Sequence, residues 1–373
     1  LLYKTAEGRR KANATRNQNQ HGFLTSLIGS KRGLVILVDY RDQRFSLEDP
    51  VATYNEIFNQ LDYKGYGMTG SVRDYFLAQS YGKFDMTLDV AGPYTLSKPM
   101  ASYGGNSEEG IDIGARAFAR ESFMLADADV DYKNYDWDGD GVVEQVFIVY
   151  AGYAEAQGGP AYTIWPHSFE LSDALKLDGV AVSKYACSSE LRGASGKNVD
   201  GIGTVCHEFS HCLGLMDHYD TSGSNFGTGP WDLMASGSYN NNSCTPAAYT
   251  AFERWCMGWL TPKELKAQTD VTGMKPLVES PEAYILYNDA NPDEFYMLEN
   301  RQLMGFDAGL YGLQVGGLLA DGNGRNDPPD HIRDPAQGEN ILRCHIVHRA
   351  FECYAHKELV KGCLVVQQYQ IVP

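Results

Sequence analysis

The stretch of sequence that most constrains this chain is HEFSHCLGLMDH at residues 207–218. On a helix, residues four apart lie on one face, so His207 and His211 can direct two imidazole nitrogens at a single ion. Imidazole nitrogen is a common zinc ligand. The stretch therefore predicts a helix that carries a zinc site.

Glu208 follows the first histidine and points far enough around the helix to miss the ion and reach a water bound to it. Zinc lowers the pKa of such a water to about 7, and a carboxylate within hydrogen-bonding reach completes the nucleophile, so Glu208 is the predicted general base. Gly214 can adopt a left-handed conformation that ends the helix and returns the chain beneath the ion. The third ligand is therefore expected within the same stretch.

Two adjacent residues compete for the place of the third ligand. The spacing H-E-x-x-H-x-x-G-x-x-H puts Asp217 at the third position, whereas a histidine, His218, follows one place later. A carboxylate oxygen and an imidazole nitrogen can both bind zinc. Because neighbouring residues after a tight turn point in different directions, only one of the two is expected to bind.

A second segment of the predicted site is WDLMASGSYN at residues 231–240, which follows a loop rich in Ser, Gly, Asn and Thr. Beside a zinc helix, Met234 is predicted to form the hydrophobic floor of a methionine turn beneath the metal. Tyr239 is predicted to donate its hydroxyl to a developing oxyanion.

Acidic residues alternate in the sequence DWDGDGVVE at residues 136–144. Oxygen ligands at alternate positions around a glycine turn are typical of calcium loops, so this loop predicts a structural Ca²⁺ site. Phe147 stands where such loops have a bidentate glutamate, so other groups must complete the coordination. The predicted ligands are Asp136, Asp138, Asp140, Val142 and Glu144.

Composition narrows the class of protein. The chain has 373 residues, 43% hydrophobic and 21% charged, and a formal net charge of −17. These values are typical of a globular protein with more than one domain. A nucleic-acid partner would need a basic patch, and a transmembrane helix would need about 20 consecutive apolar residues, so neither is expected. Cys206 and Cys212, which flank the histidines, are predicted to be buried core thiols.

Apolar patterning predicts alternating strands and helices, typical of an α/β (α+β) fold. The run at residues 33–40 is almost continuously aliphatic and indicates a buried central strand, whereas alternation at residues 180–188 indicates a half-exposed edge strand near the zinc helix. Two strands near residues 284–287 and 295–300 predict a hairpin. Further elements are a strand at 86–90, a strand at 146–150, and helices at 50–61, 70–79, 112–126 and 247–259.

Several separated motifs in one order make the chain resemble the immune inhibitor A-type metallopeptidases, secreted zincins of bacteria. In that family the zinc helix usually continues Gly-Leu-Pro-Asp-x-Tyr, which favours Asp217 over His218 as third ligand. Met216 stands at the usual proline and loosens this turn. The resemblance runs from about residue 33 to 302 and is carried by the zinc helix, the aspartate loop, residues 231–239, GSVRDYF at 70–76, SYGKF at 80–84, TIWPH at 163–167 and ENRQ at 299–302.

The resemblance implies a zincin-like catalytic domain at residues 31–265, with a twisted mixed sheet and an active-site helix. A small β-rich C-terminal domain is expected at residues 266–373, with an atypical tail at 305–373. Residues 1–30 are polar and aperiodic, which predicts a flexible leader or the remnant of a pro-segment.

The implied function is that of a zinc endopeptidase, secreted or attached to the cell surface, made with a signal peptide and using Ca²⁺ structurally. It would hydrolyse peptide bonds of extracellular proteins through a zinc-bound water, with Glu208 as base. We expect protein or peptide substrates, no nucleic-acid partner, no transmembrane segment and a monomer. The alternative, motivated by Met216 and the tail, is a catalytically inactive, calcium-stabilised binding module on the same scaffold; zinc content discriminates between the two.

Overall fold

The fold is taken from a computed structural model that describes residues 27–108, 112–219, 227–266, 269–288, 291–310, 341–347, 350–355 and 363–370. Two compact units divide the chain. Unit 1 comprises the residues up to Leu77 and Gly82–Pro246, and unit 2 comprises Ala78–Tyr81 and the chain from Ala247 onward. The predicted leader lies almost entirely outside the described residues. Within the described ranges, no helix combines the length and apolar character needed to cross a bilayer.

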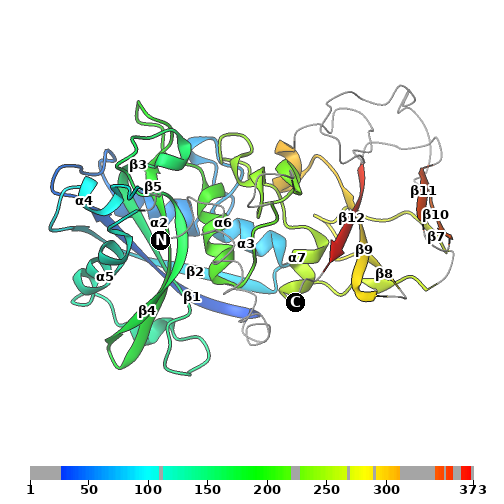
Figure 1. The fold of residues 1–373 in the computed structure, drawn as a ribbon, viewed down its shortest axis with the longest axis horizontal. Coiled ribbons are helices and arrows are strands. Elements are labelled where there is room, and N and C mark those ends of the chain that lie inside the picture. The colour runs from blue at the N-terminus through cyan, green and yellow to red at the C-terminus, as the bar shows by residue number, and fades with distance from the viewer. Residues whose placement is uncertain are drawn as a thin grey trace. The chain divides into compact units, whose positions relative to one another are not determined.

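Unit 1 is a mixed α/β fold built on a five-stranded sheet in the order β2-β1-β3-β5-β4 (Figure 1). β1 is parallel to β2 and β3, and β3 is parallel to β5, whereas β4 is antiparallel to β5. The predicted mixed sheet is therefore confirmed. The strands are β1 (Gly29–Asp39), β2 (Phe84–Thr95), β3 (Val146–Tyr153), β4 (His167–Leu177) and β5 (Val180–Leu191).

The helices of unit 1 begin and end largely where the sequence predicts. Asp49 caps α2 by accepting a hydrogen bond from the Ala52 backbone N–H at 3.0 Å, and Pro50 occupies the first turn, where its missing N–H costs nothing. The helices are α2 (Pro50–Asn59), α3 (Val72–Gln79), α4 (Ala101–Gly104), α5 (Ala115–Ala126) and α6 (Ile202–Cys212). The last two residues of α3 belong to unit 2. Short 3₁₀ turns are η1 (Gly65–Gly67), η2 (Tyr132–Tyr135), η3 (Glu155–Gln157), η4 (Gly229–Trp231) and η5 (Ser236–Tyr239).

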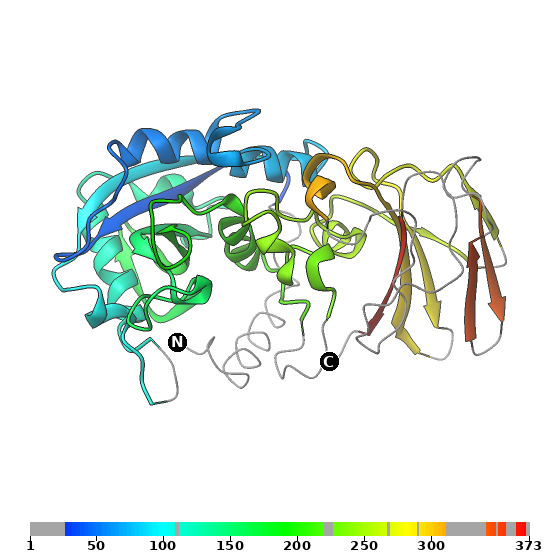
Figure 2. The same cartoon turned by 90° about the horizontal axis from the view of Figure 1, so that it is seen from above.

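Both faces of the sheet are covered, which explains the apolar run in β1. Residues 33–39 are all buried. On one face, side chains of β1, β3 and β5 pack in a cluster with Phe118 of α5. On the other face, the Phe147 ring of β3 lies 6.0 Å from Phe58 of α2 and 6.5 Å from Phe209 of α6, between ring centroids. Figure 2 shows α2, in blue, alongside β2. The prediction of a buried central strand is confirmed.

The prediction of a half-exposed edge strand at residues 180–188 is wrong. β5 lies between β3 and β4, and most of its residues are buried. The edge of the sheet next to β5 is β4, for which the sequence gives no regular alternation. Its pairing with β5 shifts register between Glu170 and Leu175, so the period of two is interrupted in the middle of the strand.

The helix of unit 2 is shorter than predicted. α7 spans Ala251–Cys256 instead of residues 247–259. Thr250 and Glu253 form a capping box, which fixes the start of the helix at Ala251. Gly258 adopts a positive φ of 72°, a conformation that ends a helix.

Unit 2 otherwise consists of strands in two small sheets. The four-stranded sheet has the order β12-β9-β8-β6, and the three-stranded sheet has the order β11-β10-β7. β8 and β9 pair antiparallel, which confirms the predicted hairpin. The boundary at residues 265 and 266 stays a prediction. The strands are β6 (Lys263–Glu264), β7 (Thr269–Thr272), β8 (Tyr284–Asn288), β9 (Asn291–Arg301), β10 (Ile341–Val347), β11 (Ala350–Ala355) and β12 (Cys363–Gln370), with a turn η6 (Gly305–Gly309).

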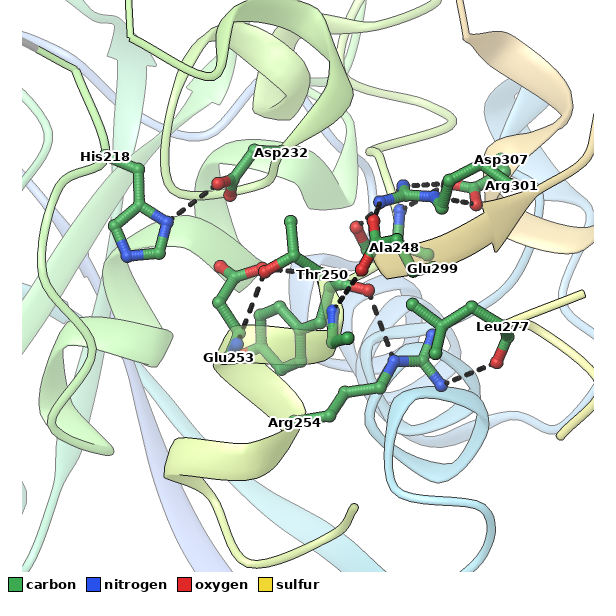
Figure 3. A network of polar contacts seen from close by, with 12 residues as sticks. His218, Asp232, Ala248, Thr250, Glu253, Arg254, Leu277, Glu299, Arg301 and Asp307 are labelled. Carbon is green, nitrogen blue, oxygen red and sulfur yellow. Dashed lines mark hydrogen bonds and ion pairs between the residues drawn. The ribbon is translucent and has the colours of Figure 1, made fainter. Parts of the chain in front are cut away.

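Two fully buried arginines organise the interior of unit 2 (Figure 3). Arg301 of β9 donates to Asp307 at 2.6 Å and to Glu299 at 3.1 Å, and it also donates to the backbone carbonyl of Ala248. Arg254 of α7 donates to two backbone carbonyls. Glu299 and Arg301 belong to the ENRQ motif, so this buried ion pair gives part of that motif a structural role.

Candidate active site

The first turn of α6 contains a glycine, Gly203, which lets the helix approach residues 236–243 closely. A Cβ atom added to Gly203 would lie 1.9 Å from the backbone oxygen of Ser238, so no other residue fits there without a shift of the backbone. The Gly203 N–H also donates to the Ser243 carbonyl at 2.8 Å. These contacts fix the first turn of α6 against residues 236–243.

The buried face of α6 anchors it to the rest of unit 1. Phe209 is fully buried, and its ring centroid lies 5.3 Å from that of Phe76. Cys206 and Cys212 are buried thiols, as predicted. The helix packs against β5 and β4. The residues between these apolar positions are therefore held in a defined orientation.

Backbone carbonyls orient both histidines of α6. Nδ1 of His207 lies 2.8 Å from the Leu233 oxygen, and Nδ1 of His211 lies 2.8 Å from the Leu215 oxygen. Because a carbonyl can only accept, each Nδ1 must carry the hydrogen and donate it. In the neutral form of each ring, the lone pair then lies on Nε2. This is the arrangement that metal-binding histidines usually have, with the second ring nitrogen donating to an oxygen.

Asp217 faces the two Nε2 atoms. Its Oδ1 lies 3.4 Å from Nε2 of His207 and 3.1 Å from Nε2 of His211. The side chain is 3% exposed, and among the described residues Oδ1 has no hydrogen-bond partner. A tetrahedral zinc with bonds of about 2.05 Å would hold its ligand atoms about 3.3 Å apart. Two nitrogens and a carboxylate oxygen at these distances fit zinc.

The same three side chains attract positive charge. Burial lowers the pKa of His207, but its close contact with Asp217 and the charges of Glu208 and Asp217 outweigh burial and raise the pKa to about 9. Burial raises the pKa of Asp217, but the charge of His211 and the close contacts with both histidines bring it well below the ordinary value. A cation between these groups would be stabilised by the same electrostatic attraction.

Glu208 and Tyr239 provide the remaining predicted groups. A carboxylate oxygen of Glu208 lies within 4.8 Å of ring nitrogens of His207 and His211. Tyr239, at the end of η5, is 50% exposed. Partial desolvation of its hydroxyl, followed by the charge of Glu208, raises the pKa of Tyr239 to about 12. The phenol therefore keeps its proton at neutral pH and can donate a hydrogen bond.

His218 is turned toward a different carboxylate. Its Nδ1 lies 2.7 Å from Oδ2 of Asp232, which is fully buried (Figure 3). The backbone N–H of His218 donates to the Met234 oxygen at 2.8 Å, and Met234 itself is fully buried. Gly214 has a φ of 103°, which confirms the predicted left-handed turn. The structure thus brings Asp217 to the two histidines of α6 and His218 to Asp232. Asp232 is not among the site residues predicted from the sequence.

The aspartate loop is closed by its own side chains. Asp136 accepts from the backbone N–H groups of Gly139 at 2.8 Å and Gly141 at 2.9 Å. Asp136, Asp138 and Glu144 each place a carboxylate oxygen within 4.8 Å of the others, whereas Asp140 accepts a hydrogen bond from the Val142 N–H. Burial raises the pKa of Glu144 to about 7, although the Trp137 N–H lowers it, and the charges of Asp138 and Asp136 raise it further. These three carboxylates could hold a cation.

A buried carboxylate that the sequence did not reveal precedes α6. Asp200 accepts from Nε2 of Gln157 at 2.8 Å and from the Gly201 N–H at 2.9 Å. Desolvation nevertheless raises the pKa of Asp200 to about 6. Oε1 of Gln157 is buried and has no hydrogen-bond partner among the described residues. The local sequence signal for Asp200 is that an acidic residue stands directly before a glycine and the start of a helix.

Comparison with known proteins shows to which family the chain belongs. Residues 30–263, which include every predicted site residue, match the family described as "Immune inhibitor A peptidase M6, catalytic domain". The chain belongs to this M6 family. The family is one of peptidases, which are hydrolases, and a relative named a metalloprotease implies a metal cofactor in the family.

Two curated M6 relatives are similar over part of their length. "Pre-pro-metalloprotease PrtV" of Vibrio cholerae serotype O1 is 30% identical over 283 residues, which cover 62% of this chain and 30% of that protein. "Immune inhibitor A" of Bacillus thuringiensis subsp. alesti is 25% identical over 260 residues, which cover 58% and 38%. The chain therefore spans about a third of the length of these relatives.

One solved structure, wild-type OgpA from Akkermansia muciniphila, aligns over 92% of this chain and 83% of that chain at 12% identity. The TM-score of 0.33 is too low for an argument about fold or function.

Proposed function

We propose that this M6 chain is a zinc-dependent endopeptidase, with His207, His211 and Asp217 as the zinc ligands. The observation that carries the proposal is the buried Oδ1 of Asp217, which lies 3.1 and 3.4 Å from two Nε2 atoms. Two carbonyls fix the tautomers of the histidines that present those atoms. His218, directed at Asp232, is the less favourable candidate for third ligand.

The side chains around this site divide the hydrolysis of a peptide bond between them. Bound zinc would act as a Lewis acid that polarises the substrate carbonyl and lowers the pKa of water. Glu208 takes the proton of the attacking water and later returns it to the leaving amine nitrogen. Tyr239 donates its hydroxyl to the oxyanion of the substrate. Met234, which is fully buried, would form the apolar floor beneath the site.

The proposed substrates are proteins or peptides outside the cell, which the enzyme meets as a secreted or surface-attached protein. An extended segment of substrate could add to β4, because this strand is one of the two edges of the sheet and α6 packs against it. The zincin-like character of unit 1 is part of this proposal.

The proposal includes a structural Ca²⁺ in the aspartate loop. Asp136, Asp138 and Glu144 supply converging oxygens, and the other predicted ligands, Asp140 and the Val142 carbonyl, lie in the same loop. Addition of Ca²⁺ to chelator-treated protein is expected to raise its thermal unfolding temperature. A temperature that does not respond to Ca²⁺ would remove this part of the proposal.

The decisive experiment replaces Glu208 by Ala. The variant is expected to retain stoichiometric zinc, because Glu208 is not a ligand, and to hydrolyse casein at a rate lower by about 10²–10⁴-fold, the range over which general bases contribute. Zinc is measured by elemental analysis and hydrolysis by release of labelled peptides.

Three results distinguish the alternatives. Hydrolysis that persists in Glu208→Ala would refute the role of this carboxylate. Wild-type protein that holds zinc but cleaves no protein or peptide would refute the endopeptidase. Wild-type protein without zinc would refute the metal site as a whole and favour the inactive binding module.

A further inference from the structure

The segment formed by residues 232–234 does more than provide an apolar floor. The Leu233 oxygen accepts from Nδ1 of His207, and the Met234 oxygen accepts from the backbone N–H of His218. The Asp232 carboxylate contacts Nδ1 of His218 at 2.7 Å. Residues 232–234 therefore contact His207, a proposed zinc ligand, and His218, the residue that directly follows the proposed ligand Asp217.

These contacts restrict Asp217 through the peptide bond that joins it to His218. The N–H of that planar bond is fixed by the Met234 oxygen, so the direction in which the chain leaves Asp217 is fixed as well. The side chain of His218 is held at its other end by Asp232. With both restraints in place, the peptide plane that follows Asp217 is fixed, which limits the directions in which its side chain can point.

Upstream of Asp217 the backbone is held at Leu215, whose oxygen accepts from Nδ1 of His211. Position 216 is a methionine, which has ordinary backbone freedom, whereas a proline would fix φ. Asp232 is itself well held, because its Oδ1 accepts from the Met234 N–H at 2.7 Å and its side chain is fully buried. In the chain of contacts from Asp232 through His218 to Asp217, Asp232 is therefore the residue that is held in place, and Asp217 is the residue whose orientation can change.

We infer that Asp232 is a positioning residue that acts through His218 to hold Asp217 in the orientation for zinc binding. The inference rests on the proposed zinc site. It assigns to the Asp232–His218 pair the task of orienting a ligand, and it makes His218 a support of the metal site instead of a ligand.

The test measures zinc affinity by competition with a chromogenic chelator, and the visible absorption of the Co²⁺-substituted protein, which reports ligand number and geometry. Asp232→Ala and His218→Ala are each expected to weaken zinc binding by roughly 10- to 100-fold, the usual cost of removing a group that orients a ligand. The double variant is expected to be no weaker than the weaker single variant, because both changes break the same contact.

Asn240→Ala is the matched control. The Asn240 side chain is buried and donates to the Pro230 oxygen at 2.8 Å, so it also braces residues 230–240. This hydrogen bond involves neither His218 nor Asp217. Its loss is expected to lower the unfolding temperature while the zinc affinity and the Co²⁺ spectrum remain those of the wild type. If a general loosening of residues 230–240 were the cause, Asn240→Ala would weaken zinc binding as much as Asp232→Ala does.

Asp232→Asn keeps the test informative if Asp232→Ala does not fold. Its amide oxygen can still accept from the Met234 N–H, but its nitrogen cannot accept from Nδ1 of His218. An affinity between those of the wild type and His218→Ala is expected. The inference is overturned if His218→Ala and Asp232→Asn both bind zinc like the wild type, or if the losses in the double variant simply add. Wild-type protein without zinc would overturn the zinc site itself, which is a separate result.

Discussion

The buried carboxylate of Asp200 predicts a measurable loss of stability as the pH rises. Asp200 is 7% exposed, and desolvation raises its pKa from the ordinary 3.8 to about 6, against the hydrogen bonds from Gln157, Gly201 and Thr204. The folded state therefore binds a proton more tightly than the unfolded chain. The stabilisation is fully present below pH 3.8 and is lost as the pH rises through about 6.

The magnitude follows from the two pKa values. The difference between about 6 and 3.8 is about 2.2, and at 1.36 kcal/mol for each pH unit this amounts to about 3 kcal/mol. When both pKa values are included in the calculation, about 2 kcal/mol of this stabilisation is lost between pH 4.5 and pH 7. The lower part of the titration lies in a range where other carboxylates also titrate.

Asp200→Asn isolates this contribution. The side-chain amide stays neutral, and its nitrogen can donate to Oε1 of Gln157, which is buried without a described partner, once the amide of Gln157 rotates. Urea unfolding of both proteins at a series of pH values gives the difference in free energy of unfolding, in which all other titrating groups cancel. We expect the wild type to lose about 2 kcal/mol relative to the variant between pH 4.5 and pH 7.

Two results would refute this reasoning. A difference that does not change with pH would mean that Asp200 has the same pKa in the folded and unfolded chain. A difference that changes in the opposite direction would mean that the hydrogen bonds outweigh desolvation and that the folded state prefers the ionised form.

Three further predictions concern single side chains. Tyr239→Phe is expected to lower kcat by about 10²-fold with a smaller effect on KM, measured with a fluorogenic peptide, because it removes one donor to the oxyanion; an unchanged kcat would exclude that role. Gly203→Ala places a Cβ 1.9 Å from the Ser238 oxygen and is expected to cost about 3 kcal/mol in urea unfolding, the upper end for overpacking, because a backbone atom must move. Arg301→Met leaves Glu299 and Asp307 buried without a counter-charge and is expected to cost about 3–5 kcal/mol. The exposed ion pair of Arg32 is the control, since Arg32→Met should change the free energy of unfolding by less than about 1 kcal/mol.

The parts of the fold and site that could be predicted depend on local periodicity. Two histidines four apart define one helix face wherever the helix lies, and Gly214 marks the turn that follows, so α6 could be located from the sequence. The continuous apolar run of β1 indicated burial on both faces. These signals lie within a few residues of the feature that they predict.

The parts that could not be predicted depend on pairs of distant residues. Asp232 contacts His218 across 14 positions and Gln157 contacts Asp200 across 43, and no spacing rule selects such partners. The burial of β5 likewise depends on β4, its neighbour in the sheet. Residue patterns show which groups can form a site, but only the fold shows which of two adjacent groups, such as Asp217 and His218, faces the histidines.

The interruption in β4 also bears on self-association. An unpaired sheet edge is a template on which another copy of a chain can add, and a long regular edge favours aggregation. In β4 the register shift divides the regular pairing into residues 167–170 and 175–177. Between them, Asp173 forms ion pairs with Arg116 and Arg120 of α5 and places charge at the interruption. The irregularity that hid this strand from the sequence pattern thus prevents a second copy from pairing along its whole length.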